Sequence, residues 1–202
     1  MRLKVDRVAC IRGGRRLFDG LTFALGPGEA IQVTGPNGAG KSSLLRLIAG
    51  LLRPADGSVA LEGRADDRPM GEALHFVGHL DGVKGALTVF ENLEFMRALL
   101  GGAMNTPDAL ARLGLAQLAD LPASNLSAGQ RRRLALARLL VASRPLWLLD
   151  EPTTALDADA RRMFSEVVSE HLSGSGMLVV ATHEPLALSG AREISLGGGA
   201  AS

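Results

Sequence analysis

Apolar positions along the chain alternate between two periods. Short runs with strand-like patterns lie at 3–5, 21–25, 30–34, 59–61, 74–77, 146–149 and 177–181. Helical spacing covers 41–49, the stretch after Thr88, a segment that starts at Thr106, a long segment from Ser127 to about Ala142, and 158–172. Strands that alternate with helices predict an α/β fold, in which a mainly parallel sheet carries helices on both faces.

Capping signals support several of these boundaries. Thr88 with Glu91, and Ser127 with Gln130, form capping boxes at the start of two expected helices. Gly50 ends the first helix. Residues 64–70 and 197–202 read as a loop and a tail.

Length and charge are typical of one compact domain. The 202 residues carry a net charge of +1, so the charge gives no reason to expect nucleic acid as the principal partner. Cys10 is the only cysteine, which suits a reducing compartment. The N-terminus lacks the apolar core of a secretion signal, and the most apolar stretch, 134–149, is interrupted by Arg138, Arg144 and Pro145. If the protein works at a membrane, we expect another subunit to hold it there.

A glycine-rich octapeptide joins the strand at 30–34 to the helix that follows. It reads Gly35-Pro36-Asn37-Gly38-Ala39-Gly40-Lys41-Ser42, with Ser43 next. This is the phosphate-binding loop pattern, whose backbone N–H groups surround phosphate oxygens at a helix start. We expect Lys41 to reach the β- and γ-phosphates of a bound nucleotide and the Ser42 hydroxyl to ligate Mg²⁺. A glycine-rich turn capping an ordinary helix is the alternative, and the full motif between strand and helix argues against it.

Two acidic residues end the apolar run at 146–149. Open α/β sheets place ligands at the carboxyl ends of their strands, where Asp150 and Glu151 would lie. We expect Asp150 to hold Mg²⁺ through a water, and Glu151 to orient and help deprotonate the attacking water. An acidic turn before Pro152 is the alternative, and the phosphate loop upstream makes it the weaker one.

Three further motifs identify a family resemblance. Leu126-Ser127-Ala128-Gly129-Gln130 precedes the acid pair, Ala155-Leu156-Asp157 follows it, and Thr182-His183 follows the last strand. In this order they resemble the signature, D-loop and switch histidine of ATP-binding cassette (ABC) ATPases. The resemblance implies one nucleotide-binding domain over 1–202, with a P-loop NTPase core, a small antiparallel β subdomain and a helical subdomain at about 80–142. It also implies catalytic roles for Glu151 and His183.

In that family the signature acts across a dimer. The Ser127–Gln130 turn of one copy closes on ATP held by the phosphate loop of the other, so the resemblance implies a second copy as partner. Ala128 stands where the family usually has glycine, which adds a methyl near the γ-phosphate. Arg131, Arg132 and Arg133 read as a solvated helix face rather than a docking patch.

Two departures from the family pattern concern nucleotide and partner recognition. Arg12 stands where the family commonly stacks an aromatic on adenine, and a guanidinium plane can stack on a base; a plain surface arginine is the alternative. The segment 77–82 lies where the family carries a glutamine that senses Mg²⁺ and the membrane partner, and it holds none. His79 is a candidate substitute, because it can donate or accept a hydrogen bond.

Within that family the chain most resembles the ATP-binding subunit of the cytochrome c biogenesis (haem export) system. The segments that carry this closer resemblance are 14–18, 87–93, 127–139 and 144–153. That implies an ATPase on integral-membrane partners at the cytoplasmic face of a bacterial inner membrane, driving haem delivery or release of a haem-loaded chaperone. Cys10, His75 and His79 are isolated, so we expect no tight haem binding by the chain itself.

Two alternatives stay open. One is the ATPase subunit of another short export cassette, for lipids or lipoproteins. The other is a soluble ABC ATPase in translation or DNA repair, although such proteins usually join two cassettes or carry long coiled-coil insertions.

Overall fold

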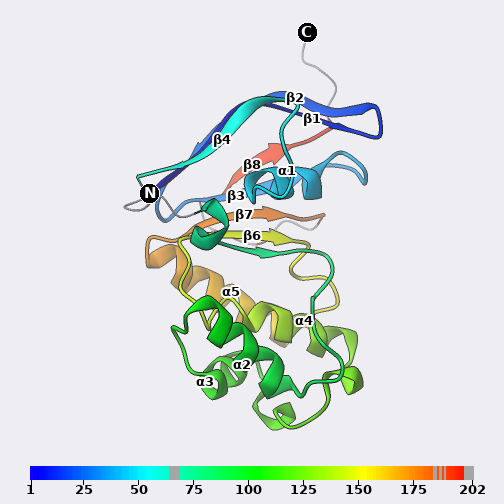
Figure 1. Ribbon diagram of the computed structural model, residues 1–202, viewed down its shortest axis with the longest axis vertical. Helices are drawn as coiled ribbons and strands as arrows, with labels where there is room; N and C mark the ends of the chain where they lie inside the picture. The colour runs from blue at the N-terminus through cyan, green and yellow to red at the C-terminus, as the bar shows by residue number, and fades with distance from the viewer. Residues whose placement is uncertain (64–68, 184–185, 187, 189, 198–202) are drawn as a thin grey trace. The chain divides into compact units, whose positions relative to one another are not determined.

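The structure, a computed structural model, describes residues 1–63, 69–183, 186, 188 and 190–197 (Figure 1). Most of the expected loop at 64–70 and nearly all of the expected tail therefore lie outside the described residues. The strands are β1 (Arg2–Arg12), β2 (Arg15–Leu25), β3 (Ala30–Thr34), β4 (Asp56–Glu62), β5 (Leu74–Val77), β6 (Leu146–Asp150), β7 (Met177–Ala181) and β8 (Arg192–Ser195). The α-helices are α1 (Lys41–Ile48), α2 (Val89–Leu100), α3 (Thr106–Arg112), α4 (Ala128–Ala137) and α5 (Ala158–Ser173). Short 3₁₀ turns are η1 (Met70–Ala73), η2 (Ala116–Leu118) and η3 (Ala123–Asn125).

The chain divides into two compact units, which we describe one at a time. The first comprises residues 1–78, 145–151 and 171–202. The second comprises residues 79–144 and 152–170. No helix in the described part of the chain combines the length and apolarity that a bilayer crossing requires.

Two sheets build the first unit. Five strands pair in the order β5-β6-β7-β3-β8, and every neighbouring pair is parallel. The residues of β6 and β7 are all buried, which explains their continuous apolar sequence. A separate antiparallel sheet has the order β2-β1-β4.

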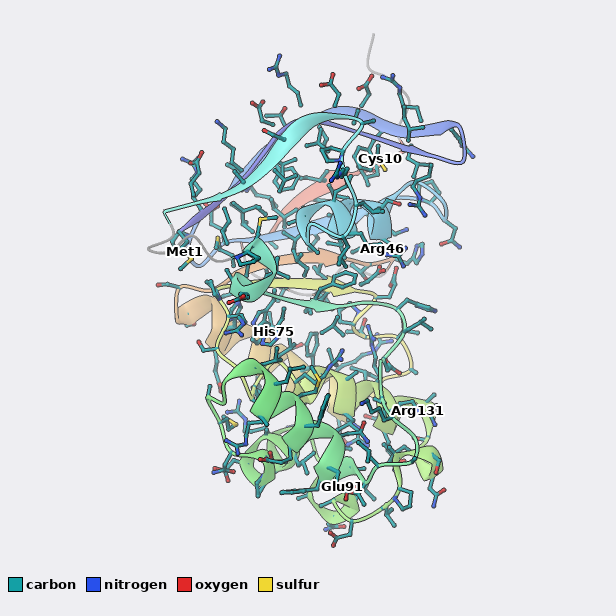
Figure 2. The ribbon with its side chains drawn as sticks, viewed as in Figure 1. Met1, Cys10, Arg46, His75, Glu91 and Arg131 are labelled. Carbon is teal, nitrogen blue, oxygen red and sulfur yellow. The ribbon has the colours of Figure 1, made fainter. Side chains whose placement is uncertain are left out.

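Helix α1 packs in the core shared by these two sheets (Figure 1). Leu44, Leu45, Leu47 and Ile48 are buried, while Arg46, labelled in Figure 2, stays exposed. This distribution agrees with the apolar face that the sequence predicts. The core therefore fixes the helix whose first residue is Lys41.

Helices and 3₁₀ turns dominate the second unit. Both predicted capping boxes are present: Thr88 caps α2 with Glu91 (labelled in Figure 2), and Ser127 caps α4 with Gln130. Helix α4 ends at Ala137, five residues short of its expected end, because the next amides bond three residues back rather than four.

The sequence missed one strand and underestimated two others. Strand β8 pairs with β3 at the edge of the parallel sheet, but its sequence, Arg-Glu-Ile-Ser, lacks an apolar run. Strands β1 and β2 are each 11 residues long, and the Gly13-Gly14 turn between them has positive φ at both glycines. The prediction of a loop over 64–70 was wrong at its last residue, because Met70 begins η1.

Candidate nucleotide-binding site

The glycine-rich loop lies between the end of β3 and the start of α1, as the sequence predicts. Gly40 occupies the N-cap with φ 104°, and no side chain caps the helix start. Two glycines of the loop leave no room for a side chain. A Cβ on Gly35 would lie 2.2 Å from the Leu196 carbonyl oxygen, and one on Gly40 would lie 3.0 Å from the Phe18 ring. The loop therefore brings backbone N–H groups close together at a helix N-terminus, which suits an anionic ligand.

Lys41 is buried beneath this loop. Its Nζ donates to the carbonyl oxygens of Gly35 at 2.7 Å and Pro36 at 3.3 Å. Only 7% of the residue is exposed. The ammonium group is thus held inside the glycine-rich loop.

The two acidic residues lie at the carboxyl end of β6. Asp150 is the last residue of the strand and is 3% exposed. Glu151 has φ 49°, a conformation uncommon for a residue with a side chain. Its N–H donates to the Ala181 carbonyl oxygen at 2.8 Å, so the bond that fixes this turn comes from the neighbouring strand β7. Left-handed backbone at such a position is typical of functional sites.

His183 brings the lysine and the glutamate together. Its backbone N–H donates to Glu151 Oε2 at 3.3 Å. Its Nε2 lies 3.4 Å from Glu151 Oε1 and also 3.4 Å from Lys41 Nζ. Three residues that are distant in the sequence therefore form one cluster beside the glycine-rich loop, all within the first unit.

The signature turn lies in the second unit, at the N-terminus of α4. Ser127 Oγ accepts the Gln130 N–H at 3.2 Å, and Gln130 Oε1 accepts the Ser127 N–H at 2.9 Å. The Ser127 hydroxyl acts only as an acceptor in this bond, so its proton can still be donated to a ligand. Ser127 and Ala128 are exposed. The turn thus presents a hydroxyl and the start of a helix to the surface.

The segment that resembles the D-loop packs directly against this turn. Ala155 has φ 64°, and a Cβ on Gly129 would lie 2.6 Å from the Ala155 carbonyl oxygen. Asp157 is exposed, and its Oδ1 accepts the Ala160 N–H at 2.8 Å at the start of α5. Together with Ser127, these residues line one surface pocket of the second unit.

The two departures from the family pattern lie on exposed surface. Arg12 ends β1 and faces Arg15 across the hairpin. His79 is exposed in the segment after β5. Phe18, whose ring packs on Gly40, is an aromatic residue next to the glycine-rich loop that was not among the predicted site residues. Phe18 is out of phase with the alternation of Leu21, Phe23 and Leu25, so the strand pattern does not mark it.

The prediction of a solvated face for the three consecutive arginines was wrong for Arg132. Only 4% of Arg132 is exposed, and it pairs with Asp81. Arg133 is half-buried and donates to the carbonyl oxygens of Leu113 and Gly114, both at 3.1 Å. Burial of this kind needs a partner distant in the sequence, which helical spacing does not reveal.

Comparison with known proteins agrees with this geometry. The family described as ABC transporter matches residues 18–154. The cytochrome c biogenesis ATP-binding export protein CcmA of Nitrobacter winogradskyi is 53% identical over 201 residues, covering 99% of this chain and 100% of the relative. The protein of the same name from Bradyrhizobium diazoefficiens is 51% identical over 199 residues, covering 98% and 99% of the two chains.

Solved structures support the fold. A putative ABC transporter ATP-binding protein from Pyrococcus furiosus superposes with a TM-score of 0.84 at 24% identity, over 97% of this chain and 98% of that one. The five-stranded parallel sheet, the small antiparallel sheet and the helices agree with the P-loop NTPase fold that the sequence predicts. The chain therefore belongs to the ABC transporter family, as a nucleotide-binding ATPase similar over nearly its whole length to the ATP-binding export proteins of cytochrome c biogenesis.

Proposed function

We propose that the chain is the ATP-hydrolysing subunit of a membrane export complex for c-type cytochrome biogenesis, with haem as the cargo or a haem-loaded chaperone as the species released. The observation that carries the ATPase part is the cluster of Lys41, His183 and Glu151 beside the Gly35–Ser42 loop. The cargo follows from the names of relatives that are more than 50% identical over nearly the full chain.

Each residue of the cluster has a defined task. The loop N–H groups and Lys41 bind the phosphates, because both supply positive charge at a helix start. Glu151 orients the attacking water and accepts its proton. His183 holds the Glu151 carboxylate through its backbone N–H. Its ring would face the γ-phosphate. Ser43 and the exposed residues Pro36 to Gly38 complete the loop.

The oxygen donors of the first unit fit Mg²⁺. Ser42 lies in the first turn of α1, and the Asp150 carboxylate ends β6. Hydroxyl and carboxylate oxygens are the hard ligands that this ion prefers. Ser42 and Asp150 would hold it, Asp150 through a water, and the ion would neutralise charge on the β- and γ-phosphates.

Two copies are needed to complete a site in this proposal. The exposed Ser127 hydroxyl and the Ala128–Gly129 backbone of one copy would contact the γ-phosphate bound by the other, and Asp157 would lie at the same interface. Gln130 supports this turn through its bond to Ser127. Arg12 would stack on the adenine, because its guanidinium is exposed at the end of β1.

Integral-membrane subunits would hold the protein at the cytoplasmic face of a bacterial inner membrane. His79 is exposed in the segment after β5 and would take the place of the partner-sensing glutamine. The second unit, residues 79–144 and 152–170, would be the helical subdomain that receives these subunits. We propose neither a nucleic-acid partner nor tight haem binding by this chain.

Deleting the gene in its own host and staining membrane and periplasmic proteins for covalently bound haem tests the proposal. Loss of all c-type cytochromes, restored by the wild type but not by Glu151→Gln, is the expected result. Unchanged cytochromes would overturn the haem assignment, while the ATPase chemistry would be judged separately on the purified chain. Restoration by Glu151→Gln would overturn the need for hydrolysis.

A further inference from the structure

Arg132 is a buried cation at the junction of three chain segments of the second unit. Its Nη1 donates to Asp81 Oδ1 at 2.8 Å, and its Nε donates to the Pro152 carbonyl oxygen at 3.3 Å. The side chain of Arg132 is 5% exposed and that of Asp81 is 20% exposed. A buried guanidinium is retained only where its donors and its charge are matched, so this geometry is strictly specified.

The three segments are those that carry the proposed chemistry. Arg132 lies on α4, whose first turn is the Ser127–Gly129 signature. Pro152 directly follows Glu151 in the sequence. Asp81 belongs to the segment 79–85, which also contains His79. One side chain therefore connects, by hydrogen bonds or through the backbone, the signature, the residue after the general base and the segment after β5.

A second arginine, Arg138 at the C-cap of α4, lies beside the same segment. Burial lowers the pKa of Arg138, whereas the Asp81 carboxylate raises it and the Arg132 guanidinium lowers it. Arg138 Nη1 would lie 3.3 Å from a Cβ on Gly82, so its guanidinium packs against the residue next to Asp81. The Asp81 carboxylate thus attracts two arginines, one on α4 and the other at its C-cap.

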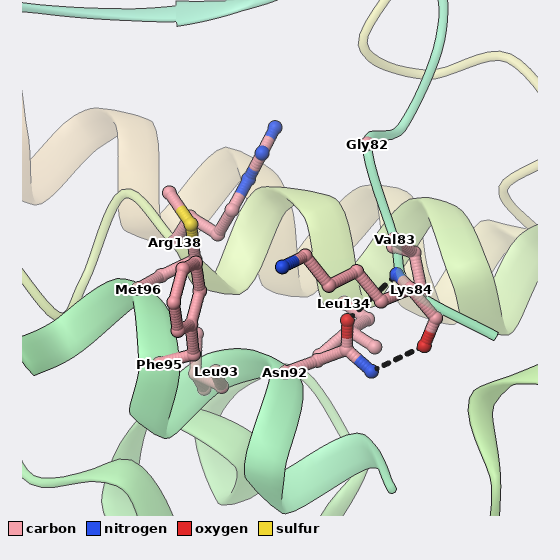
Figure 3. A pocket seen from close by; sticks show the side chains of 9 residues that line it. All are labelled: Gly82, Val83, Lys84, Asn92, Leu93, Phe95, Met96, Leu134 and Arg138. Atoms are coloured by element: carbon pink, nitrogen blue, oxygen red, sulfur yellow. Dashed lines mark hydrogen bonds between the residues drawn. The ribbon is translucent and has the colours of Figure 1, made fainter. Parts of the chain in front are cut away.

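The other end of the segment 79–85 is fixed by α2. Asn92 Nδ2 donates to the Lys84 carbonyl oxygen at 2.9 Å, and the Lys84 N–H donates to Asn92 Oδ1 at 2.8 Å (Figure 3). Lys84 Nζ also lies 4.3 Å from the Phe95 ring centroid. With both ends held, a change at Asp81 shifts α4 or the turn at Pro152 more readily than it loosens the segment as a whole.

We propose that Arg132 is a positioning residue for ATP hydrolysis: through Asp81 and the Pro152 carbonyl it sets the signature turn relative to the peptide that follows Glu151. The inference rests on the proposed function, because it needs the signature and Glu151 to act on ATP. It assigns Arg132 no contact with ATP. Losing the pair should therefore lower kcat and leave ATP binding by the phosphate loop nearly unchanged.

Steady-state ATPase assays on the purified full chain, in a double-mutant cycle, test this assignment. Asp81→Asn keeps an oxygen that can accept from Arg132 and removes only the charge, and Arg132→Gln shortens the side chain. Each should lower kcat roughly 10- to 100-fold while KM for ATP changes by less than about twofold. Because the two act as a unit, the double variant should be no slower than the slower single variant. Asp159→Asn is the matched control, since it breaks an exposed ion pair with Arg162 in the same unit.

Hydrogen–deuterium exchange gives a readout that does not depend on turnover. In Asp81→Asn, peptides covering 127–133 should exchange faster, while peptides covering 106–112 should not change. Unchanged exchange at 127–133, unchanged kcat in both single variants, or additive losses in the double variant would each overturn the proposal. So would a matching rise in KM or faster exchange throughout the unit, which indicates general destabilisation. A wild type no faster than Glu151→Gln would instead count against the proposed ATPase chemistry, and the exchange result would still decide the positioning role.

Discussion

Alanine at position 129 would add a methyl group where two loops of the second unit meet. An ideal Cβ on Gly129 lies 2.6 Å from the Ala155 carbonyl oxygen, whereas ordinary contacts begin at 3.4 Å. The signature turn and the D-loop segment must therefore separate by about 0.8 Å, the difference between these two distances. Overpacking of this kind costs about 1–3 kcal/mol. A displacement near 1 Å in a catalytic part lowers the rate by up to about 100-fold.

The assay is steady-state ATP hydrolysis by the purified chain, with kcat and KM determined separately. Gly129→Ala should lower kcat roughly 10- to 100-fold and leave KM within about twofold, because the phosphate loop belongs to the other unit. Ala128→Gly is the matched change on the adjacent residue of the same turn, where the side chain is exposed. It removes a methyl from the face that would approach the γ-phosphate, so hydrolysis should be as fast as in the wild type or faster.

Two results would refute this reasoning. A Gly129→Ala protein with the wild-type kcat would show that the D-loop segment adapts to the methyl without consequence. An Ala128→Gly protein slower than the wild type would show that the alanine assists closure rather than opposing it. Thermal unfolding of each variant separates a local displacement from a loss of the folded protein.

Three other predictions concern the first unit. Lys41→Ala should raise the Kd for a fluorescent ATP analogue roughly 10- to 100-fold, because a charge-assisted contact is lost, while the exposed Lys4→Ala should not. Glu151→Gln should bind the analogue normally but lose about 100-fold or more in kcat, and ordinary turnover would contradict its role as base. Burial lowers the pKa of His171, which stacks on Trp147 at 3.7 Å, so its neutral form is favoured in the folded state. Urea unfolding followed by Trp147 fluorescence should therefore give a constant free energy of unfolding well above pH 6.5 and a declining one as the pH falls below it. His171→Gln should flatten that decline, and an identical decline in the variant would contradict this prediction.

The parts of the site that the sequence predicts are those made by continuous chain. The phosphate loop needs only a strand, a glycine-rich turn and a helix in succession, and the structure has β3, residues 35–40 and α1 in that order. Asp150 and Glu151 are recognisable for the same reason, since two acidic residues directly follow a continuous apolar run and so mark the carboxyl end of a buried strand. The capping boxes depend on side chains three residues apart, so they too could be read directly.

What the sequence could not predict depends on partners brought together by folding. Arg132 has the spacing and flanking charges of a solvated helix face, and its burial depends on partners distant in the sequence, such as Asp81, 51 residues away. Strand β8 carries no apolar pattern because, among the described strands, it pairs only with β3 at a sheet edge, where a strand needs less buried surface. The requirement for glycine at 129 is likewise invisible, because it arises from the Ala155 carbonyl oxygen.

In the cluster of Lys41, His183 and Glu151, the position of the imidazole proton decides which neighbour His183 hydrogen-bonds. His183 Nε2 is equally distant from Lys41 Nζ and Glu151 Oε1, and a single ring nitrogen cannot accept from the first while donating to the second. Lys41 already donates to the carbonyl oxygen of Gly35, so it does not depend on the imidazole as an acceptor. The arrangement with the proton on Nε2 satisfies all three groups, because the imidazole then donates to the carboxylate. Phosphate binding, as proposed, would draw Lys41 toward the anion and away from the ring, which would favour the same tautomer. In the proposed function, Lys41 and Glu151 are therefore linked through the hydrogen bond that the His183 ring makes.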